Sequence, residues 1–374
     1  MTVLWLALPG LCIWAAILCL PWRPWSTREF LDADPGAAQA DLGALTILIP
    51  ARNEAGLIED TLRAAAAQGS GHRLLVIDDQ STDGTGERAM ALGLPGTEVL
   101  PGAPLPEGWT GKLWALEQGR RRATTPLVLL LDADIELCPG TVAALVRKMS
   151  EEDLGLVSLM ARLRMENAWE RLLMPAFIYF FKLLYPFGLS NARGTPIAAA
   201  AGGCILVKRE ALEKIGGFSA VRGELIDDCA LARAVKRAGY GTWIGLTHSA
   251  VSRRPYPGVR SIWDMVARTA YTQLRHSPLL LALCTVLMVC AFVLPVIALF
   301  VPGAAAAGIL ALLLMAAGYV PTLRFYELGI GWAAAMPVAG ALFLLMTWGS
   351  AVRHWQGAGA LWKDRSYAHT VRTR

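Results

Sequence analysis

The chain lacks several features that would place it in a familiar class. Its seven cysteines include no Cys-x-x-Cys pair, which argues against both a disulfide framework and a zinc site. No long basic run with interleaved aromatic residues is present, so nucleic acid is not an expected partner. The absence of a disulfide framework favours a reducing, cytosolic environment for the polar part of the chain.

Charge is also scarce. Only 17% of the 374 residues are charged, whereas 55% are hydrophobic and the mean hydropathy is +0.43. This composition is too apolar for a wholly soluble protein, so membrane segments are expected. The formal net charge of +5 is modest, and in a membrane protein such a bias commonly reflects the positive-inside rule.

Long apolar stretches lie at both ends of the chain. At ~1.5 Å per residue, residues 3–20 could cross a hydrocarbon core of ~30 Å. No positive charge precedes them, so residues 1–25 are predicted to be an N-terminal anchor rather than a cleaved signal peptide. Residues 278–352 are predicted to hold three further spans, at about 278–301, 304–321 and 330–352.

The predicted membrane topology contains a conflict. Arg23 and Arg28 follow the anchor, which predicts that the next domain lies in the cytosol. Three crossings from there would place the basic tail, residues 353–374, on the outer side, although its charges favour the cytosol. Either one segment is re-entrant or interfacial, or the rule fails for this chain.

Between these ends, over about residues 43–275, strand and helix patterns alternate. Short apolar runs such as Leu74–Ile77 and Leu127–Leu131 are each followed by a helical pattern, which predicts an α/β fold with a mostly parallel, doubly wound sheet. Two helices in this region, at about 169–187 and 259–275, are predicted to lie in the membrane interface. For the first, a buried core helix is an equal alternative.

Polar clusters fall at strand ends or in the loops beyond them. They are Pro50–Glu54, Asp78–Thr85, Asp132–Asp134 and Asp227–Leu231. Ligands of open α/β sheets collect at the carboxyl ends of strands, although each cluster alone could be a cap, a turn or a solvated helix start. Asp132 and Asp134 would repel each other without a cation, and a divalent ion shared with substrate phosphates is the usual remedy.

Together these clusters resemble the motifs of glycosyltransferase family 2. The matching sequences are Pro-Ala-Arg-Asn-Glu, Asp-Asp-Gln-Ser-Thr-Asp-Gly-Thr, Asp-Ala-Asp and Asp-Asp-x-x-Leu. The resemblance covers about residues 43–275 and implies a GT-A (Rossmann-like) fold. The membrane segments and the stretch 202–218 look closest to the bacterial hopanoid (hopene)-associated glycosyltransferases, with ceramide- and carotenoid-modifying enzymes as near relatives.

The resemblance implies roles for the first three motifs. The first two would form the nucleotide side of the site, through Pro50, Ala51, Asn53, Glu54, Asp78 and Asp79. Asp132 would also face the diphosphate, and Asp132 and Asp134 would bind Mg²⁺ or Mn²⁺. Such a metal offsets the charge that develops on a departing nucleoside diphosphate.

The same resemblance assigns a lysine and a general base. Lys112, in a Gly-Lys-x-x-Ala-Leu pattern, would contact the diphosphate, although Glu117 stands where the family usually has Asn. Asp228 matches the Asp of the family's Glu-Asp-x-x-Leu motif and would take the proton of the acceptor hydroxyl. Its neighbour Asp227 remains an alternative base. In-line attack opposite the diphosphate would invert the anomeric configuration.

Two later segments bear on the acceptor. The Gln-x-x-Arg-Trp motif that family members often carry after the base is absent, and the nearest region is Arg253-Arg254-Pro255. Processive polymer synthesis is therefore disfavoured, and a single transfer to a lipid is preferred. Near the end, Trp362–Tyr367 resembles a Trp-Lys-Gly-Arg-x-Tyr motif of membrane-bound relatives.

We therefore expect a membrane-bound, multi-pass, inverting hexosyltransferase of the bacterial cytoplasmic (inner) membrane, with its catalytic domain facing the cytosol. The expected donor is a nucleotide sugar, with a UDP-sugar preferred, and the expected acceptor is a lipid hydroxyl such as that of a hopanoid. One alternative is transfer to a polyprenyl phosphate. Another is a non-catalytic membrane scaffold with a degenerate transferase domain.

Overall fold

The computed structural model describes residues 6–357, 360–362 and 365–367 of the chain. It forms two compact units. The helical unit contains residues up to 28 together with 165–188 and 255–360, and the sheet unit contains 29–164, 189–254 and the end of the chain. Half of the predicted basic tail and part of the Trp362–Tyr367 motif lie outside the described residues, which in the tail are 353–357 and the short strands β9 (Ala360–Trp362) and β10 (Arg365–Tyr367).

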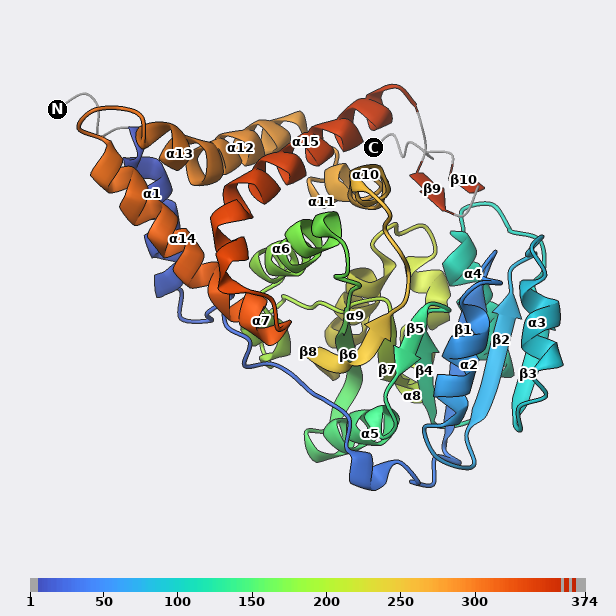
Figure 1. Cartoon of the computed structure of the whole chain (residues 1–374). Helices are drawn as coiled ribbons and strands as arrows, with labels where there is room; N and C mark the ends of the chain where they lie inside the picture. The colour runs from blue at the N-terminus through green and yellow to red at the C-terminus, as the bar shows by residue number, and fades with distance from the viewer. Residues whose placement is uncertain (1–5, 358–359, 363–364, 368–374) are drawn as a thin grey trace. The chain divides into compact units, whose positions relative to one another are not determined.

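Eight strands in the described part of the sheet unit form one sheet, in the order β3-β2-β1-β4-β7-β6-β8-β5 (Figure 1). Their bounds are β1 Leu45–Ala51, β2 Arg73–Asp78, β3 Thr97–Pro101, β4 Leu127–Leu131, β5 Ile135–Leu137, β6 Leu154–Arg162, β7 Cys204–Lys208 and β8 Gly241–Ser252. The pairs β1–β2, β1–β4, β2–β3 and β6–β8 are parallel. Strand β7 runs antiparallel to β4 and β6, and β5 runs antiparallel to β8.

The helices of this unit lie on both faces of the sheet. They are α2 Ile58–Ala66, α3 Thr85–Ala91, α4 Gly111–Arg122, α5 Thr141–Glu151, α8 Arg209–Lys214 and α9 Asp227–Arg237. Helices α2, α3 and α5 contribute to one apolar core, and α4, α8 and α9 contribute to the other. The predicted α/β fold, with a mostly parallel sheet flanked by helices, is confirmed.

Strand β4 shows why the sheet could be recognised in the sequence. Leu129 and Leu131 enter the first core, whereas Val128 and Leu130 enter the second. Successive side chains of a strand point to opposite faces, so a strand covered on both faces reads as one continuous apolar run.

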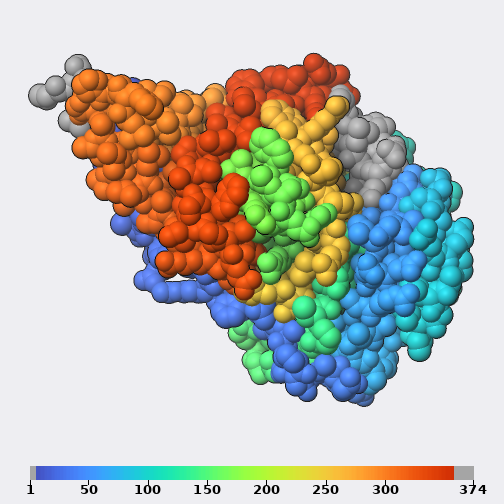
Figure 2. Space-filling model, in the orientation of Figure 1, coloured from blue at the N-terminus to red at the C-terminus, as the bar shows by residue number. Residues whose placement is uncertain are grey.

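The helical unit contains three helices in its described part that are long and apolar enough to cross a membrane, Pro278–Ala298, Ala305–Phe325 and Ile330–Trp355. The first comprises α12 (Pro278–Met288), a π-helical turn (Val289–Val293) and α13 (Leu294–Ala298); the second is α14 (Ala305–Phe325); the third ends in α15 (Met336–Trp355). Large apolar side chains of these helices are exposed, including Leu279 at 77% and Leu313 at 60%. Figure 2 shows the helices in orange to red. The three predicted C-terminal segments are confirmed as apolar helices.

The predicted N-terminal span is a shorter helix. Helix α1 covers only Leu8–Cys19, 12 residues, which corresponds to about 18 Å and falls short of a ~30 Å hydrocarbon core. It ends there because Leu20 is extended (ψ 129°), the conformation favoured by a residue that precedes a proline, here Pro21. Trp14 is buried, and its Nε1 donates to the carbonyl of Ala291 at 2.9 Å.

The apolar segment predicted at 169–187 is mainly helix α6 (Ala168–Leu184). Leu173, Ile178 and Tyr179 are fully buried, and α6 packs against α14 and α15. Its ends expose Trp169 and Leu184. The predicted helix at 259–275 is divided into α10 (Val259–Ala267) and α11 (Ala270–Gln273), which both pack against α15. A place in the membrane interface remains a prediction for both segments.

Candidate active site

The predicted motifs meet at one edge of the sheet. Strands β1, β2 and β4 are parallel, so the loops that follow Ala51, Asp78 and Leu131 leave the sheet at the same edge. Strand β8 ends at this edge and the reversed strand β7 begins there, because β6 and β8 run in the same direction as β4. The edge is therefore completed by the segments 202–203 and 252–254, in addition to the motifs.

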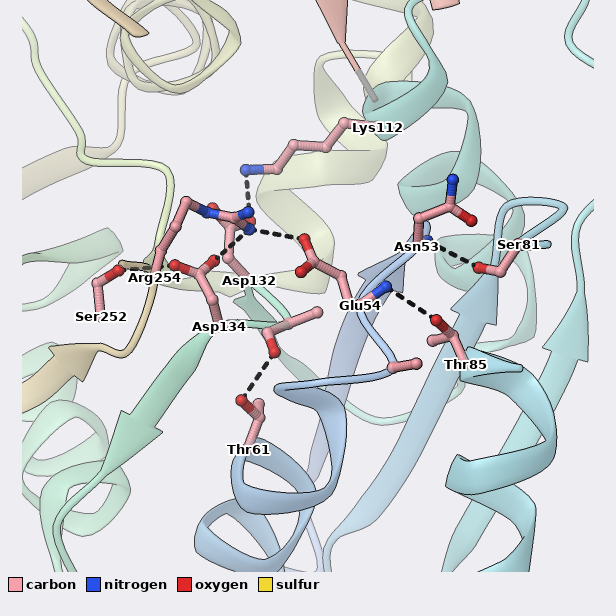
Figure 3. A network of polar contacts seen from close by, with 12 residues as sticks. Asn53, Glu54, Thr61, Ser81, Thr85, Lys112, Asp132, Asp134, Ser252 and Arg254 are labelled. Atoms are coloured by element: carbon pink, nitrogen blue, oxygen red, sulfur yellow. Dashed lines mark hydrogen bonds and ion pairs between the residues drawn. The ribbon is translucent and has the colours of Figure 1, made fainter. Parts of the chain in front are cut away.

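Hydrogen bonds join the loops after β1 and β2. The backbone N–H of Asn53 donates to Ser81 Oγ at 3.0 Å, and Asn53 Oδ1 accepts from the N–H of Thr82 at 2.9 Å. The N–H of Glu54 donates to Thr85 Oγ1 at 2.8 Å (Figure 3). Asn53 has a left-handed φ of 51°, which Asn tolerates better than most residues. The Asn53 side chain therefore holds the two loops in register.

The acidic pair at the end of β2, Asp78 and Asp79, lies beside the end of β1. Asp78 Oδ1 accepts from the N–H of Ser81 at 3.1 Å, which supports the turn. Asp79 is fully buried, and its N–H donates to the carbonyl of Ala51 at 2.8 Å. The guanidinium of Arg52 donates to the carbonyl of Asp79 at 2.6 Å. In β1, Pro50 is buried and is in register with Ile77 of β2.

The Asp-Ala-Asp turn after β4 is held from several directions. Thr61 Oγ1 donates to the carbonyl of Ala133 at 2.8 Å, and Ser252 Oγ donates to Asp134 Oδ2 at 2.6 Å. The backbone N–H of Arg253 donates to the carbonyl of Asp134 at 2.8 Å. Asp134 is thereby fixed in orientation and is only 8% exposed.

Two cations contact the acids of this turn. Lys112, near the start of α4, places Nζ 2.5 Å from Asp132 Oδ1. Arg254, just beyond β8, places Nη2 2.6 Å from Glu54 Oε1 and 3.3 Å from Asp134 Oδ1 (Figure 3). Glu54 and the acids of the Asp-Ala-Asp turn come from motifs that are far apart in the sequence, and each of them contacts Lys112 or Arg254.

The electrostatics of this region are tightly coupled. Burial disfavours the ammonium of Lys112, but the carboxylates around it, chiefly that of Asp132, outweigh this effect and raise the pKa of Lys112 above its ordinary value. The pKa of Asp132 is raised by burial and by the like charge of Asp134, against the opposing effect of Lys112. Asp132 therefore depends on a cation nearby to stay ionised.

Asp228 lies in the first turn of α9 and shares a pocket with Lys112 and Asp227. Its Oδ2 accepts from the N–H of Gly202 at 2.9 Å, and its Oδ1 accepts from the N–H of Cys229 at 2.7 Å. Burial, and secondly the like charge of Asp227, raise the pKa of Asp228 to about 6. A carboxylate with this pKa is ionised at neutral pH and is still basic enough to accept a proton.

Gly202 forms hydrogen bonds with both Lys112 and Asp228. Its carbonyl accepts from Lys112 Nζ at 3.3 Å, while its N–H donates to Asp228. A Cβ at this position would lie 3.2 Å from Lys112 Nζ and 3.5 Å from Asp228 Oδ2. A side chain here would press against Lys112 and would lie in van der Waals contact with Asp228.

The donor set fits a divalent cation whose coordination is completed by substrate. Asp132 and Asp134 offer carboxylate oxygens, which Mg²⁺ and Mn²⁺ prefer. Within the described residues, no three His, Cys, Asp or Glu side chains gather as a metal site. The remaining ligands would have to be water and diphosphate oxygens, which is the usual arrangement for Mg²⁺ in phosphate-transfer sites.

Glu117, the departure from the family pattern, has a structural role. It is 3% exposed and accepts from the guanidinium groups of Arg120 and Arg121. It also accepts from the backbone N–H of Phe218 at 3.1 Å. These partners account for a buried glutamate at this position and lower its pKa against the effect of burial.

The structure therefore brings the predicted acids and Lys112 to a single edge of one unit. The nucleotide-side residues Pro50, Ala51, Asn53, Asp78 and Asp79 lie in and beyond the adjoining strands β1 and β2. Gly202, Ser252 and Arg254 belong to no predicted set of site residues. For Arg254 a signal existed, because Arg253-Arg254-Pro255 is the region nearest to the place where family members often carry Gln-x-x-Arg-Trp.

Comparison with known proteins agrees with this geometry. Residues 46–216 match the model of the family described as glycosyl transferase family 2. Over 198 residues the chain is 29% identical to the 4,4'-diaponeurosporenoate glycosyltransferase of Staphylococcus aureus (strain MRSA252), and the match covers 51% of each chain. The chain thus spans about half the length of the curated relatives it matches.

Among solved structures, the chain is similar to a mannosyltransferase from Pyrobaculum calidifontis in complex with GDP-Man and Mn²⁺. The TM-score is 0.56 at 23% identity, and the match covers 93% of this chain and 99% of the other. At this level of identity the similarity shows the fold. The predicted GT-A fold is confirmed.

Proposed function

Because residues 46–216 form a glycosyl transferase family 2 domain, we propose that this chain transfers a sugar from a nucleotide-diphosphate sugar to the hydroxyl group of a membrane lipid. The observation that carries this proposal is the convergence of a diphosphate-binding arrangement and a base. Lys112 contacts Asp132 on one side, and it shares its pocket with Asp228 on the other. Lys112 thus lies next to an acid proposed to bind the metal and next to the acid proposed to act as the base.

The donor would lie along the edge formed by β1, β2 and β4. Ala51, Glu54 and Asp79 would hold the nucleoside, and Lys112 would neutralise the diphosphate. Asp132 and Asp134 would hold Mg²⁺ or Mn²⁺, which offsets the negative charge of the leaving group when bound. A charged lysine beside the same oxygens adds to this stabilisation, because it is already in place before the reaction.

Asp228 would act as the general base. The acceptor oxygen attacks the anomeric carbon and its proton passes to the Asp228 carboxylate. The bond between the anomeric carbon and the phosphate oxygen breaks, and the nucleoside diphosphate leaves with the electron pair. Attack opposite the leaving group inverts the anomeric configuration. The leaving group is already stable as an anion, so the second carboxylic acid required by glycoside hydrolases is unnecessary here.

A lipid acceptor is supported by the helical unit and by the relative. Three helices in the described part of the chain could span a membrane, and the Staphylococcus aureus relative is a 4,4'-diaponeurosporenoate glycosyltransferase. A hopanoid hydroxyl, a UDP-sugar donor and a site on the cytosolic side of a bacterial inner membrane complete the proposal. The cytosol is the side on which nucleotide sugars would be available.

The proposal is tested with membranes that contain the chain. They are incubated with a panel of radiolabelled UDP- and GDP-sugars, and the extracted lipids are analysed by mass spectrometry. A glycosylated lipid that is formed by the wild type and lost in Asp228→Asn would support transfer to a hydroxyl. A sugar–phosphate lipid that forms equally in both would instead support a polyprenyl-phosphate acceptor, which is already an anion and needs no base.

A scaffold without catalytic activity is tested by calorimetry. The solubilised chain is titrated with UDP and with GDP in the presence of Mn²⁺. If neither nucleoside diphosphate binds, the transferase proposal fails and the scaffold alternative stands. The ion pairs at Lys112 and Arg254 favour binding, because they place positive charge at the edge where a diphosphate would lie.

A further inference from the structure

Arg254 occupies an unusual position between two acids. Its Nη2 lies 2.6 Å from Glu54 Oε1 and 3.3 Å from Asp134 Oδ1, although Glu54 and Asp134 follow different strands. The side chains of Glu54 and Asp134 are 8% and 11% exposed, whereas that of Arg254 is 31% exposed. In Figure 3 its guanidinium group lies between the two carboxylates.

The guanidinium of Arg254 compensates the negative charges of Glu54 and Asp134. Two nearly buried carboxylates are costly to bring together unless a cation compensates them. Asp134 is also one of the two acids proposed to hold a divalent metal. A guanidinium and a divalent cation at the same carboxylate repel each other, so both cannot be accommodated without movement of the arginine. Arg254 has more freedom to move than its acidic partners because it is the most exposed of the three.

We propose that Arg254 is an internal counter-ion that occupies the cation site of the donor-free chain and transfers to the donor's diphosphate when the metal and donor bind. This inference rests on the proposed function. The metal displaces the guanidinium from Asp134, and the diphosphate that arrives with the metal provides a new anionic partner. Guanidinium groups suit this exchange, because their planar array of N–H donors matches both carboxylate and phosphate oxygens.

The neighbouring residue provides a matched control. Arg253 carries the same charge, but its guanidinium pairs with Glu136, and both of these side chains are largely exposed. Its contribution to the site is the backbone N–H that donates to the carbonyl of Asp134. Arg253→Gln therefore removes one positive charge next to the site and leaves the contact with Asp134 in place.

The experiment measures two affinities in the solubilised full-length chain. Binding of Mn²⁺ alone is followed by electron paramagnetic resonance of the free ion, and binding of UDP and GDP with saturating Mn²⁺ is followed by calorimetry. Wild type, Arg254→Gln, Arg254→Lys and Arg253→Gln are compared. Thermal unfolding of each variant verifies that it is folded, and Arg254→Lys retains the charge if the glutamine variant proves unstable.

The two affinities are expected to change in opposite directions. In Arg254→Gln the affinity for Mn²⁺ alone rises about tenfold, because its competitor is gone, and the affinity for the nucleoside diphosphate falls about tenfold, each change equal to about 1.4 kcal/mol. Arg254→Lys keeps the Mn²⁺ affinity near that of the wild type and loses diphosphate affinity, because the ammonium lacks the planar array of donors. Arg253→Gln resembles the wild type in both.

Three results would overturn the inference. If Arg254→Gln weakens both affinities, Arg254 is only a structural support of the site. If it changes neither, or if Arg254→Lys equals the wild type in both, the guanidinium does not exchange partners. Failure of the wild type to bind UDP or GDP would instead defeat the proposed function, so the two failures are distinguishable.

Discussion

Replacement of Asp228 by Asn is the most direct test of the mechanism. Asparagine has nearly the same shape but cannot take a proton from the acceptor. Both carboxylate oxygens of Asp228 accept a backbone N–H, from Gly202 at 2.9 Å and from Cys229 at 2.7 Å. An amide can keep only one of these bonds, so a loss of about 1 kcal/mol in folding stability is expected. This is too small to unfold a domain of ordinary stability.

The effect on catalysis is much larger. A positioned general base contributes roughly 10²–10⁴-fold, so kcat of Asp228→Asn is expected to fall by at least about 100-fold while the affinity for the donor changes little. The pH profile gives a second measure. The pKa of Asp228 is raised to about 6, and its ionised form is the active one. Between pH 7 and pH 5 its ionised fraction, and with it kcat/KM of the wild type, falls roughly tenfold.

The assay follows transfer of radiolabelled sugar to extracted lipid between pH 5 and pH 8. Asp227→Asn serves as the companion variant, because Asp227 raises the pKa of its neighbour without being the base in this mechanism. Its acid limb should move to lower pH, whereas Asp228→Asn should show no acid limb at all. If Asp228→Asn keeps more than a third of the wild-type rate on a hydroxyl acceptor, the assignment of the base is wrong.

Substitutions at three further positions separate effects on binding from effects on folding. Lys112→Met should weaken UDP or GDP binding at least about tenfold, measured by calorimetry, whereas Lys112→Arg should keep most of it, because one charge-assisted hydrogen bond is worth roughly 1.5–3 kcal/mol. Asn53→Ala removes the acceptor of the Thr82 N–H and a residue suited to a left-handed φ, so nucleotide affinity should fall several-fold; unchanged affinity would contradict a loop-ordering role. Glu117→Gln should lower the thermal unfolding midpoint and leave nucleotide affinity within about twofold, since a buried charge network is weakened away from the donor.

The sheet could be predicted because its strands are covered on both faces. Residues Val128 to Leu131 alternate between two cores, and this produces the uninterrupted apolar run that marks a buried strand. The antiparallel direction of β7 could not be predicted, because the apolar composition of Cys204–Lys208 does not indicate in which direction the strand runs. Its reversal is a long-range property of pairing with β4 and β6.

Some residues of the candidate site could be predicted from the sequence, because their type and their position indicate a chemical role. Asp132 and Asp134 could be named because two carboxylates this close at a strand end repel each other without a cation, whereas Asp228 was named through the resemblance of its motif. Arg254 could not be assigned in the same way, since its partner Glu54 lies 200 positions earlier and only the fold brings them together. The extent of α1 was misjudged for a local reason, because the chain turns out of the helix before Pro21.

Segments of the two units alternate along the chain, and this limits how the chain can be shortened. A fragment of residues 29–254 would retain the eight-stranded sheet with its flanking helices and also α6, which belongs to the helical unit. Leu173 and Tyr179, now fully buried, would lose α14 and α15 as packing partners and face water, and such a fragment would aggregate. A water-soluble catalytic fragment therefore requires an internal deletion of residues 165–188, with Arg164 joined to Leu189 by a flexible linker.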